Sequence, residues 1–130
     1  MRKNKKKELG AFYTPQNTAD YMVSLLSNFS NNSKLLEPSG GDGVFVSTIL
    51  KKNLLKPNQI TVWDINPRTK KNINKLKIEN VVVKDSLLNT NLFDNSPFKK
   101  GTFTHIIGNP PYLNKQSSYI KKNKKELKNI

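Results

Sequence analysis

The middle of the chain alternates between short apolar runs and stretches in which apolar residues recur every three or four positions. The first such stretch predicts a helix over residues 15–29, opened by a Thr-Pro pair. A short apolar run over residues 34–37 ends at a proline and is typical of a buried parallel strand. A glycine-rich turn then leads into a second helix, about residues 44–52, in which Phe45 and Ile49 are expected to face the sheet.

The alternation continues toward the carboxyl end. Residues 59–63 are predicted to form a second strand, residues 67–77 a third helix, and residues 81–83 a third strand. Residues 86–101 have the pattern of a loop, and residues 103–107 predict a fourth strand. This order predicts an α/β fold with a mostly parallel sheet of about four strands joined by right-handed crossovers.

Acidic residues are scarce, yet they concentrate at the predicted strand ends. Glu37, Asp42, Asp64 and Asp85 all lie at or just beyond the end of a strand, as does Asn109. In open parallel sheets, ligands bind at the carboxyl ends of the strands, where the direction of the connections switches. We therefore expect these side chains to line one crevice.

The positive charge of the chain lies mainly at its two ends. The formal net charge is +14, with five basic residues in residues 1–7 and six lysines in residues 115–130. Such tails suit a polyanion such as DNA, because each neutralised phosphate releases counterions. Lysine nevertheless accounts for 21 of the 23 basic residues and asparagine is enriched as well, which an AT-rich genome would produce without any selection for DNA binding. The charge alone therefore decides little.

The chain contains no cysteine. Disulfides and thiolate metal sites are thereby excluded, and so is methylation of the cytosine ring carbon, which needs a thiolate nucleophile. No run of residues approaches the length of a membrane span, and no apolar signal core follows the basic start. We expect a cytoplasmic protein without a membrane partner and without a bound metal.

The block Asn109-Pro110-Pro111-Tyr112 follows the fourth predicted strand directly. Two consecutive prolines donate no backbone hydrogen bond and fix φ, so they end the strand in a stiff loop. That loop carries one planar amide and one aromatic ring. The pair suits a flat heterocycle, with Asn109 bonded to its edge and Tyr112 stacked on its face.

Three segments together resemble a known enzyme family. They are residues 10–15 (GAFYTP), residues 35–45 (LLEPSGGDGVF) and residues 109–112 (NPPY). In this order they resemble the gamma-type adenine-specific DNA methyltransferases of restriction-modification systems. The resemblance implies a Rossmann-like fold that binds S-adenosylmethionine and modifies the exocyclic amine of adenine. It covers residues 8–112.

The resemblance also implies roles for individual residues. Residues at the glycine-rich turn and in the N-terminal motif would hold the methionine end of the cofactor, with Glu37 or Asp42 near its ammonium: Tyr13, Thr14, Glu37, Pro38, Gly41, Asp42 and Gly43. The glycines permit positive φ and let backbone amides approach the ligand. Gly40 departs from the family, where a Cys or Ala is more usual, and should soften the turn.

Asp64 follows the second strand at the spacing expected of a carboxylate that binds ribose hydroxyls. Its neighbours Trp63 and Ile65 are candidates to enclose the adenine of the cofactor, and Asp85 to accept a hydrogen bond from the amine of that adenine. The alternative for Asp64 is a surface residue that caps the next helix.

The implied catalytic residues are Asn109, Pro110 and Tyr112. Acceptors on Asn109 and on the Pro110 carbonyl would hold the two hydrogens of the target amine, while Tyr112 stacks on a base flipped out of the duplex. Two alternatives remain open. One is a methyltransferase that acts on ribosomal RNA or on a protein glutamine amide, and the other is a non-catalytic fragment.

Three regions are expected. Residues 1–8 would be a basic tail, residues 9–114 a partial methyltransferase domain, and residues 115–130 a Lys/Asn-rich continuation of a longer domain. The family needs further strands and a target-recognition region, so we expect a complementing segment or subunit and weak catalysis by this chain alone. The fourth strand would then present an uncovered apolar edge.

Overall fold

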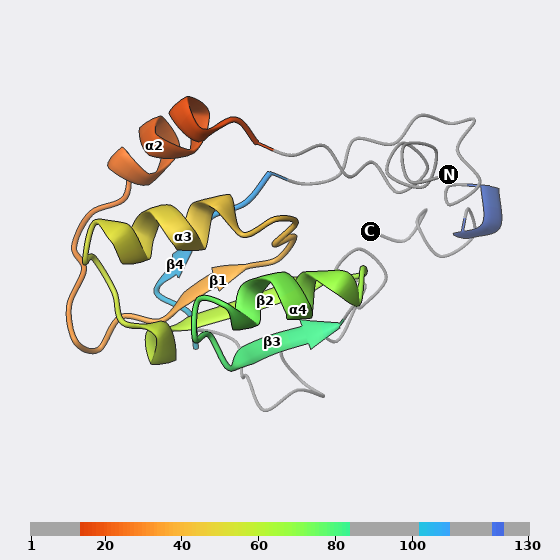
Figure 1. Ribbon diagram of the computed structural model, residues 1–130. Coiled ribbons are helices and arrows are strands. Elements are labelled where there is room, and N and C mark those ends of the chain that lie inside the picture. Colours follow the sequence, from red (N-terminus) through yellow and green to blue (C-terminus); the bar gives the residue numbers. More distant parts are fainter. Residues whose placement is uncertain (1–13, 84–101, 110–120, 124–130) are drawn as a thin grey trace.

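The computed structural model describes residues 14–83, 102–109 and 121–123 (Figure 1). In chain order the elements are α2 (Gln16–Ser24), β1 (Leu35–Glu37), α3 (Val44–Lys51), the 3-10 turn η1 (Pro57–Gln59), β2 (Ile60–Asp64), α4 (Arg68–Asn74), β3 (Asn80–Val83) and β4 (His105–Ile106). Within these ranges, no helix has both the length and the apolar character needed to cross a membrane.

The four strands form one sheet in the order β3-β2-β1-β4, and all three pairings are parallel. The chain builds the sheet outward from β1 to β3 and then returns to place β4 on the other side of β1. The register pairs Leu36 with both Thr61 and Ile106. The predicted α/β fold with four parallel strands is confirmed, and the direction of the connections switches between β1 and β4.

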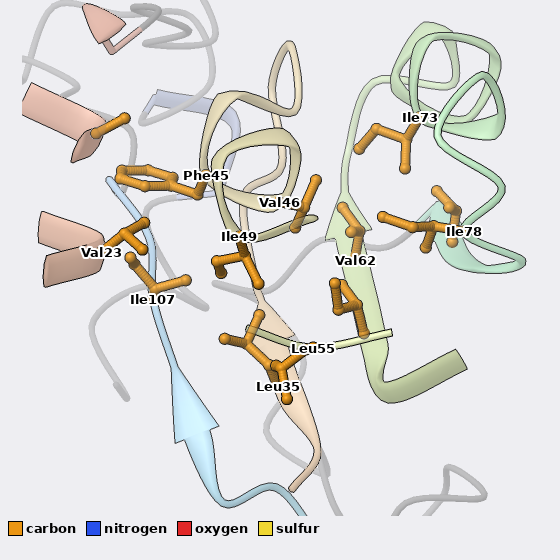
Figure 2. Packing of buried hydrophobic residues seen from close by; sticks show 13 residues of the cluster. Val23, Leu35, Phe45, Val46, Ile49, Leu55, Val62, Ile73, Ile78 and Ile107 are labelled. Atoms are coloured by element: carbon orange, nitrogen blue, oxygen red, sulfur yellow. The ribbon is translucent and has the colours of Figure 1, made fainter. Parts of the chain in front are cut away.

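Helices α2, α3 and α4 pack against one face of this sheet. Their buried side chains meet those of the strands in a single cluster, which includes Val23 of α2, Phe45 and Ile49 of α3, and Ile73 of α4 (Figure 2). Phe45 and Ile49 are 3% and 0% exposed, which confirms their predicted orientation toward the sheet. Burial of such residues provides most of the favourable free energy of folding.

Every second side chain along each strand lies on the opposite face of the sheet. Leu36, Thr61 and Trp63 lie on it and are at most 5% exposed, whereas Val82 and Ile106 are 39% and 58% exposed. Among the described strands, β4 pairs only with β1. Within residues 14–83 and 102–109, β4 thus lies at an edge of the sheet with the apolar Ile106 exposed.

Helix α2 is shorter than the predicted helix over residues 15–29. It ends at Ser24, and Leu25 is 65% exposed. Asn28 adopts a positive φ of 62°, which no helix accommodates, and the chain turns so that Phe29 stacks on His105 with 4.5 Å between ring centroids. Phe29 thus packs on the core from a loop. Its helical spacing from Met22 therefore predicted a longer helix than the one that forms.

Other boundaries differ by smaller amounts. Helix α4 is shorter than the predicted 67–77, because positive φ at Lys77 ends the turn that follows it. Strand β4 comprises two residues of the predicted five, although the Ile107 amide still donates to Leu36 at 3.1 Å. The predicted loop 86–101 and tails lie outside the described residues, apart from 121–123, and the domain boundaries stay predictions.

Candidate functional site

The carboxyl ends of β1 and β4 lie side by side. The Ser39 hydroxyl donates to the Asn109 backbone oxygen at 3.2 Å. A Cβ on Gly108 would lie 3.1 Å from Oε1 of Glu37 and 3.3 Å from Cδ of Pro38, so the two strand ends approach closely. This is the position at which parallel sheets bind ligands, because adjacent connections leave in opposite directions.

The glycine-rich turn after β1 is held by its own amides. The amide of Gly40 donates to the Trp63 oxygen at 3.0 Å, that of Gly41 to Oδ2 of Asp64 at 2.7 Å, and that of Gly43 to the Gly40 oxygen at 2.8 Å. These three amides are therefore engaged within the protein, contrary to the expectation that they approach a ligand. Gly41 and Gly43 do adopt positive φ, at 55° and 82°.

A glycine is needed at position 40 because a side chain there would collide with its neighbours, and not because the backbone has a positive φ. A Cβ there would lie 2.3 Å from Cγ1 of Val62, well inside van der Waals contact, and 3.2 Å from Cδ1 of Ile73. The expectation that Gly40 merely softens the turn is therefore wrong. The absent side chain lets the turn lie directly on β2 and α4.

Asp64 connects the end of β2 to this turn. Besides accepting from Gly41, the carboxylate accepts from the Asn66 amide through Oδ1 at 2.8 Å. It thus supports the chain that enters α4, where the Asn66 side chain in turn accepts from the Arg68 amide at 3.0 Å. Asp64 is half-buried and does not cap α4, and each of its oxygens keeps a further lone pair for a ligand, so the ribose role stays a prediction.

Glu37 is the most unusual group in the site. It is 1% exposed, and its Oε1 accepts from the Ser39 amide at 3.4 Å, while Oε2 is buried without a hydrogen-bond partner among the described residues. Burial raises the pKa of Glu37 well above its usual value, against the hydrogen bond from Ser39 and with the help of the charges on Asp64 and Asp42. An unpaired buried carboxyl oxygen is costly, so the site favours a ligand that supplies a donor.

The remaining cofactor candidates on this edge are more open. Asp42 is exposed, and its Oδ1 accepts from the Val44 amide at 3.3 Å at the start of α3. Ile65 is 40% exposed just beyond β2 and offers an apolar surface. Trp63, in contrast, is 2% exposed and packs edge-on against Phe103 with 6.1 Å between ring centroids, so it cannot enclose a ligand as expected.

Residues 95 positions apart meet at Asn109. The Asn109 Nδ2 atom donates to Oγ1 of Thr14 at 3.1 Å, and Thr14 is 8% exposed. Asn109, three residues beyond the end of β4, therefore contacts the segment that precedes α2. The structure thus brings together Thr14, the turn after β1 and Asn109, as the sequence motifs predicted, while Tyr13, Asp85, Pro110 and Tyr112 lie outside the described residues.

Sequence reasoning missed two contacts at this edge. The Ser39 hydroxyl fixes the backbone of Asn109, and the Thr14 hydroxyl engages its side chain. Spacing carries no signal for either, since both contacts join segments distant in the sequence. Glu37 was singled out, but its burial and its unpaired oxygen follow only from the way β4 closes over β1.

The hydrogen-bond acceptors and the apolar surface at this edge fit S-adenosylmethionine. Oε2 of Glu37 lacks a donor that an ammonium group would supply, Asp64 has lone pairs suited to ribose hydroxyls, and Ile65 offers an apolar contact. The carboxylates make the same edge unfavourable for a phosphate-bearing ligand. The residues present therefore match a ligand that carries positive charge and hydroxyl groups without phosphate.

Comparisons with known proteins agree with this chemistry. A family model described as N-6 DNA Methylase matches residues 1–129. The Type II methyltransferase M.HincII of Haemophilus influenzae is 29% identical over 128 residues, which are 98% of this chain and 22% of that protein.

Two further relatives show the same pattern. The Type II methyltransferase M.HindII of Haemophilus influenzae is 29% identical over 98% of this chain and 21% of its own length. The modification methylase CviBIII of Paramecium bursaria Chlorella virus NC1A is 28% identical over 95% of this chain and 31% of its own length. The chain thus spans between a fifth and a third of the length of these relatives.

Proposed function

The chain belongs to the N-6 DNA methylase family, and on that premise we propose that it forms the cofactor-binding part of a restriction-modification enzyme that methylates the exocyclic amine of adenine in DNA. The observation that carries the proposal is the buried, unpaired Oε2 of Glu37 at the switch point of the sheet, beside Asp64 and close to Asn109. The named relatives favour DNA over RNA or protein as the substrate.

The cofactor in this proposal is S-adenosylmethionine, which when bound supplies a methyl group on an electrophilic sulfonium. Glu37 would accept from the ammonium of its methionine end, with Asp42 contributing negative charge at the rim. Asp64 would accept from the ribose hydroxyls while it keeps its bonds to Gly41 and Asn66. Thr14 and Tyr13 would close over the methionine end, with Pro38 and Gly43 beside it. Ile65 would contact the adenine of the cofactor, and Asp85 would accept from the amine of that adenine.

Catalysis in this proposal rests on positioning. The amine of adenine is a poor nucleophile because its lone pair is delocalised into the ring. Oδ1 of Asn109 and the Pro110 carbonyl would accept its two hydrogens and favour the geometry in which the lone pair is available, while Tyr112 stacks on the flipped base. Asn109 is suited to this role because its backbone is held by Ser39, which leaves only side-chain torsions to be fixed.

The proposal also includes a DNA partner and a complementing strand. Ile106 on β4 is 58% exposed, and β4 pairs only with β1 among the described strands. A further strand placed against this edge, from another segment or subunit, would cover the apolar side chain. It would also form hydrogen bonds with the backbone groups along the outer side of β4. The basic tails would add affinity for the DNA backbone.

Calorimetric titration with S-adenosylmethionine tests the cofactor assignment. Loss of a charge-assisted hydrogen bond costs about 1.5–3 kcal/mol, so Glu37→Gln should weaken binding by about 10- to 150-fold. The exposed Glu79 gives a matched control, and Glu79→Gln should bind as the unaltered chain does. Equal affinities for all three proteins, or no binding at all, would remove the basis of the proposal.

The substrate class is tested separately with cofactor labelled in its methyl group. Label should appear in DNA that contains adenine, and neither in RNA nor in protein. If the chain alone transfers no label, the assay is repeated with a relative's remaining length supplied as a separate polypeptide. Transfer to RNA or protein in preference to DNA would favour the alternative substrates.

A further inference from the structure

The contact between Thr14 and Asn109 has a consequence for the proposed reaction. Asn109 must present an oxygen acceptor, not an NH₂ donor, to the target amine. The two ends of its amide group are related by a simple rotation, so something has to select between them. The only described polar side chain bonded to this amide is Thr14, through Nδ2 at 3.1 Å.

A hydroxyl group can serve either orientation of the amide. It has one hydrogen to donate and two lone pairs to accept with, so it can receive a hydrogen bond from Nδ2 or give one to Oδ1. The hydroxyl becomes selective when its own hydrogen is held by another acceptor. It can then only accept, and the amide has to turn Nδ2 toward it and Oδ1 away from it.

The surrounding structure keeps the two side chains in contact. The backbone oxygen of Asn109 is fixed by the Ser39 hydroxyl at 3.2 Å, and Thr14 is 8% exposed, so neither residue is free to move away. In the proposed function Thr14 lies against the methionine end of the cofactor, and the carboxylate of that end is an acceptor without any hydrogen to give.

We propose that Thr14 is a positioning residue whose hydroxyl, once its hydrogen is held by the cofactor carboxylate, turns Oδ1 of Asn109 toward the target amine. Binding of the cofactor and preparation of the catalytic amide are then one event, and a chain without cofactor does not present its acceptor reliably. The inference rests on the proposed function.

The side-chain NH₂ resonances of Asn109 in a ¹⁵N-labelled sample report this contact directly. Thr14→Val has the same shape without the hydroxyl and should shift these resonances, whereas Thr14→Ser should restore their positions. The NH₂ group of Gln16, which donates to Oγ1 of Thr48 at 2.8 Å, is an internal reference and should stay in place. Unchanged Asn109 resonances in the valine variant, with the serine variant as a folded comparison, would overturn the proposal.

Two probes then test the role of the carboxylate. S-Adenosylhomocysteine carries it, whereas methylthioadenosine has the same nucleoside without the amino acid. The first probe should shift the Asn109 NH₂ resonances in the unaltered and serine proteins but not in the valine variant, and the second should leave them unchanged.

An equal response to both probes would contradict the selection by the carboxylate, even if the cofactor site is correct. Failure of the proposed function looks different, because no backbone amide of residues 40–44 would then respond to either probe. In that case the selection by the cofactor carboxylate is refuted. The spectra of the unaltered, valine and serine proteins without any probe still decide whether Thr14 holds the Asn109 amide.

Discussion

Replacing Glu37 with glutamine should stabilise the free chain at neutral pH, although it removes a proposed ligand-binding group. The Glu37 side chain is 1% exposed, and its Oε2 has no hydrogen-bond partner among the described residues. Burial, together with the charges of Asp64 and Asp42, raises the pKa of this carboxyl well above its usual value of 4.5. The folded chain therefore resists an ionisation that the unfolded chain undergoes freely.

The sign of the pH dependence follows from proton binding. Between the usual pKa of 4.5 and the raised value, the folded state keeps the proton of Glu37 and the unfolded state has lost it. The stability that this carboxyl contributes is complete below the usual pKa and is lost as the pH rises through the raised one. A tenfold difference in proton affinity between the folded and unfolded states corresponds to about 1.4 kcal/mol.

Glu37→Gln keeps the shape of the side chain and cannot ionise. It still leaves one buried polar group unpaired, so at low pH its free energy of unfolding should be close to that of the unaltered chain. By about pH 8 the variant should be the more stable protein, by about 1.4 kcal/mol for each tenfold difference in proton affinity between the folded and unfolded carboxyl.

Urea denaturation of both proteins at several pH values between about 4 and 8 measures this difference. Glu79→Gln removes an exposed carboxyl and should leave the pH profile unchanged. If the stability curves of the unaltered chain and Glu37→Gln run parallel over the whole range, then burial does not oppose the ionisation of this carboxyl and the reasoning is refuted.

Further outcomes follow from the contacts of the site. Gly40→Ala should lose about 1–2 kcal/mol of stability in urea, since overpacking against Cγ1 of Val62 outweighs the entropic gain, and the loss should shrink when Val62→Ala makes room; equal losses in both backgrounds would contradict this. Asp64→Asn should turn a donor toward the amide of Gly41 or Asn66 and cost about 1–3 kcal/mol, seen as faster amide exchange at Gly41. Asn109→Ala should abolish methyl transfer and leave cofactor affinity nearly unchanged by calorimetry, whereas loss of both together would count against its catalytic role. The 130-residue chain alone should methylate DNA weakly or not at all, and robust transfer by it would refute the need for a complementing segment.

The fold could be predicted largely from the sequence because its signals are local. The two central strands, β1 and β2, are short apolar runs that end at Glu37 and Asp64. The order of runs and helices then fixes a parallel sheet, and a parallel sheet gathers its strand ends at one edge. That is why the edge at which the predicted site residues gather followed from the sequence along with the fold.

The errors arose where tertiary contacts override local pattern. Phe29 has helical spacing after Met22 but leaves the helix to stack on His105. Gly40 looked like an optional glycine until the packing of Val62 beneath it was known. The hydrogen bond between Thr14 and Asn109 joins residues that no periodicity relates, so only the folded chain could reveal it.

Mapping of backbone amide shifts during titration with S-adenosylmethionine tests the central claim most directly. If the carboxyl ends of β1, β2 and β4 form one ligand site, the amides of residues 40–44, 64–66 and 108–109 should move together with a single affinity. Shifts confined to the amino ends of the strands, or absent from all three segments, would contradict the account.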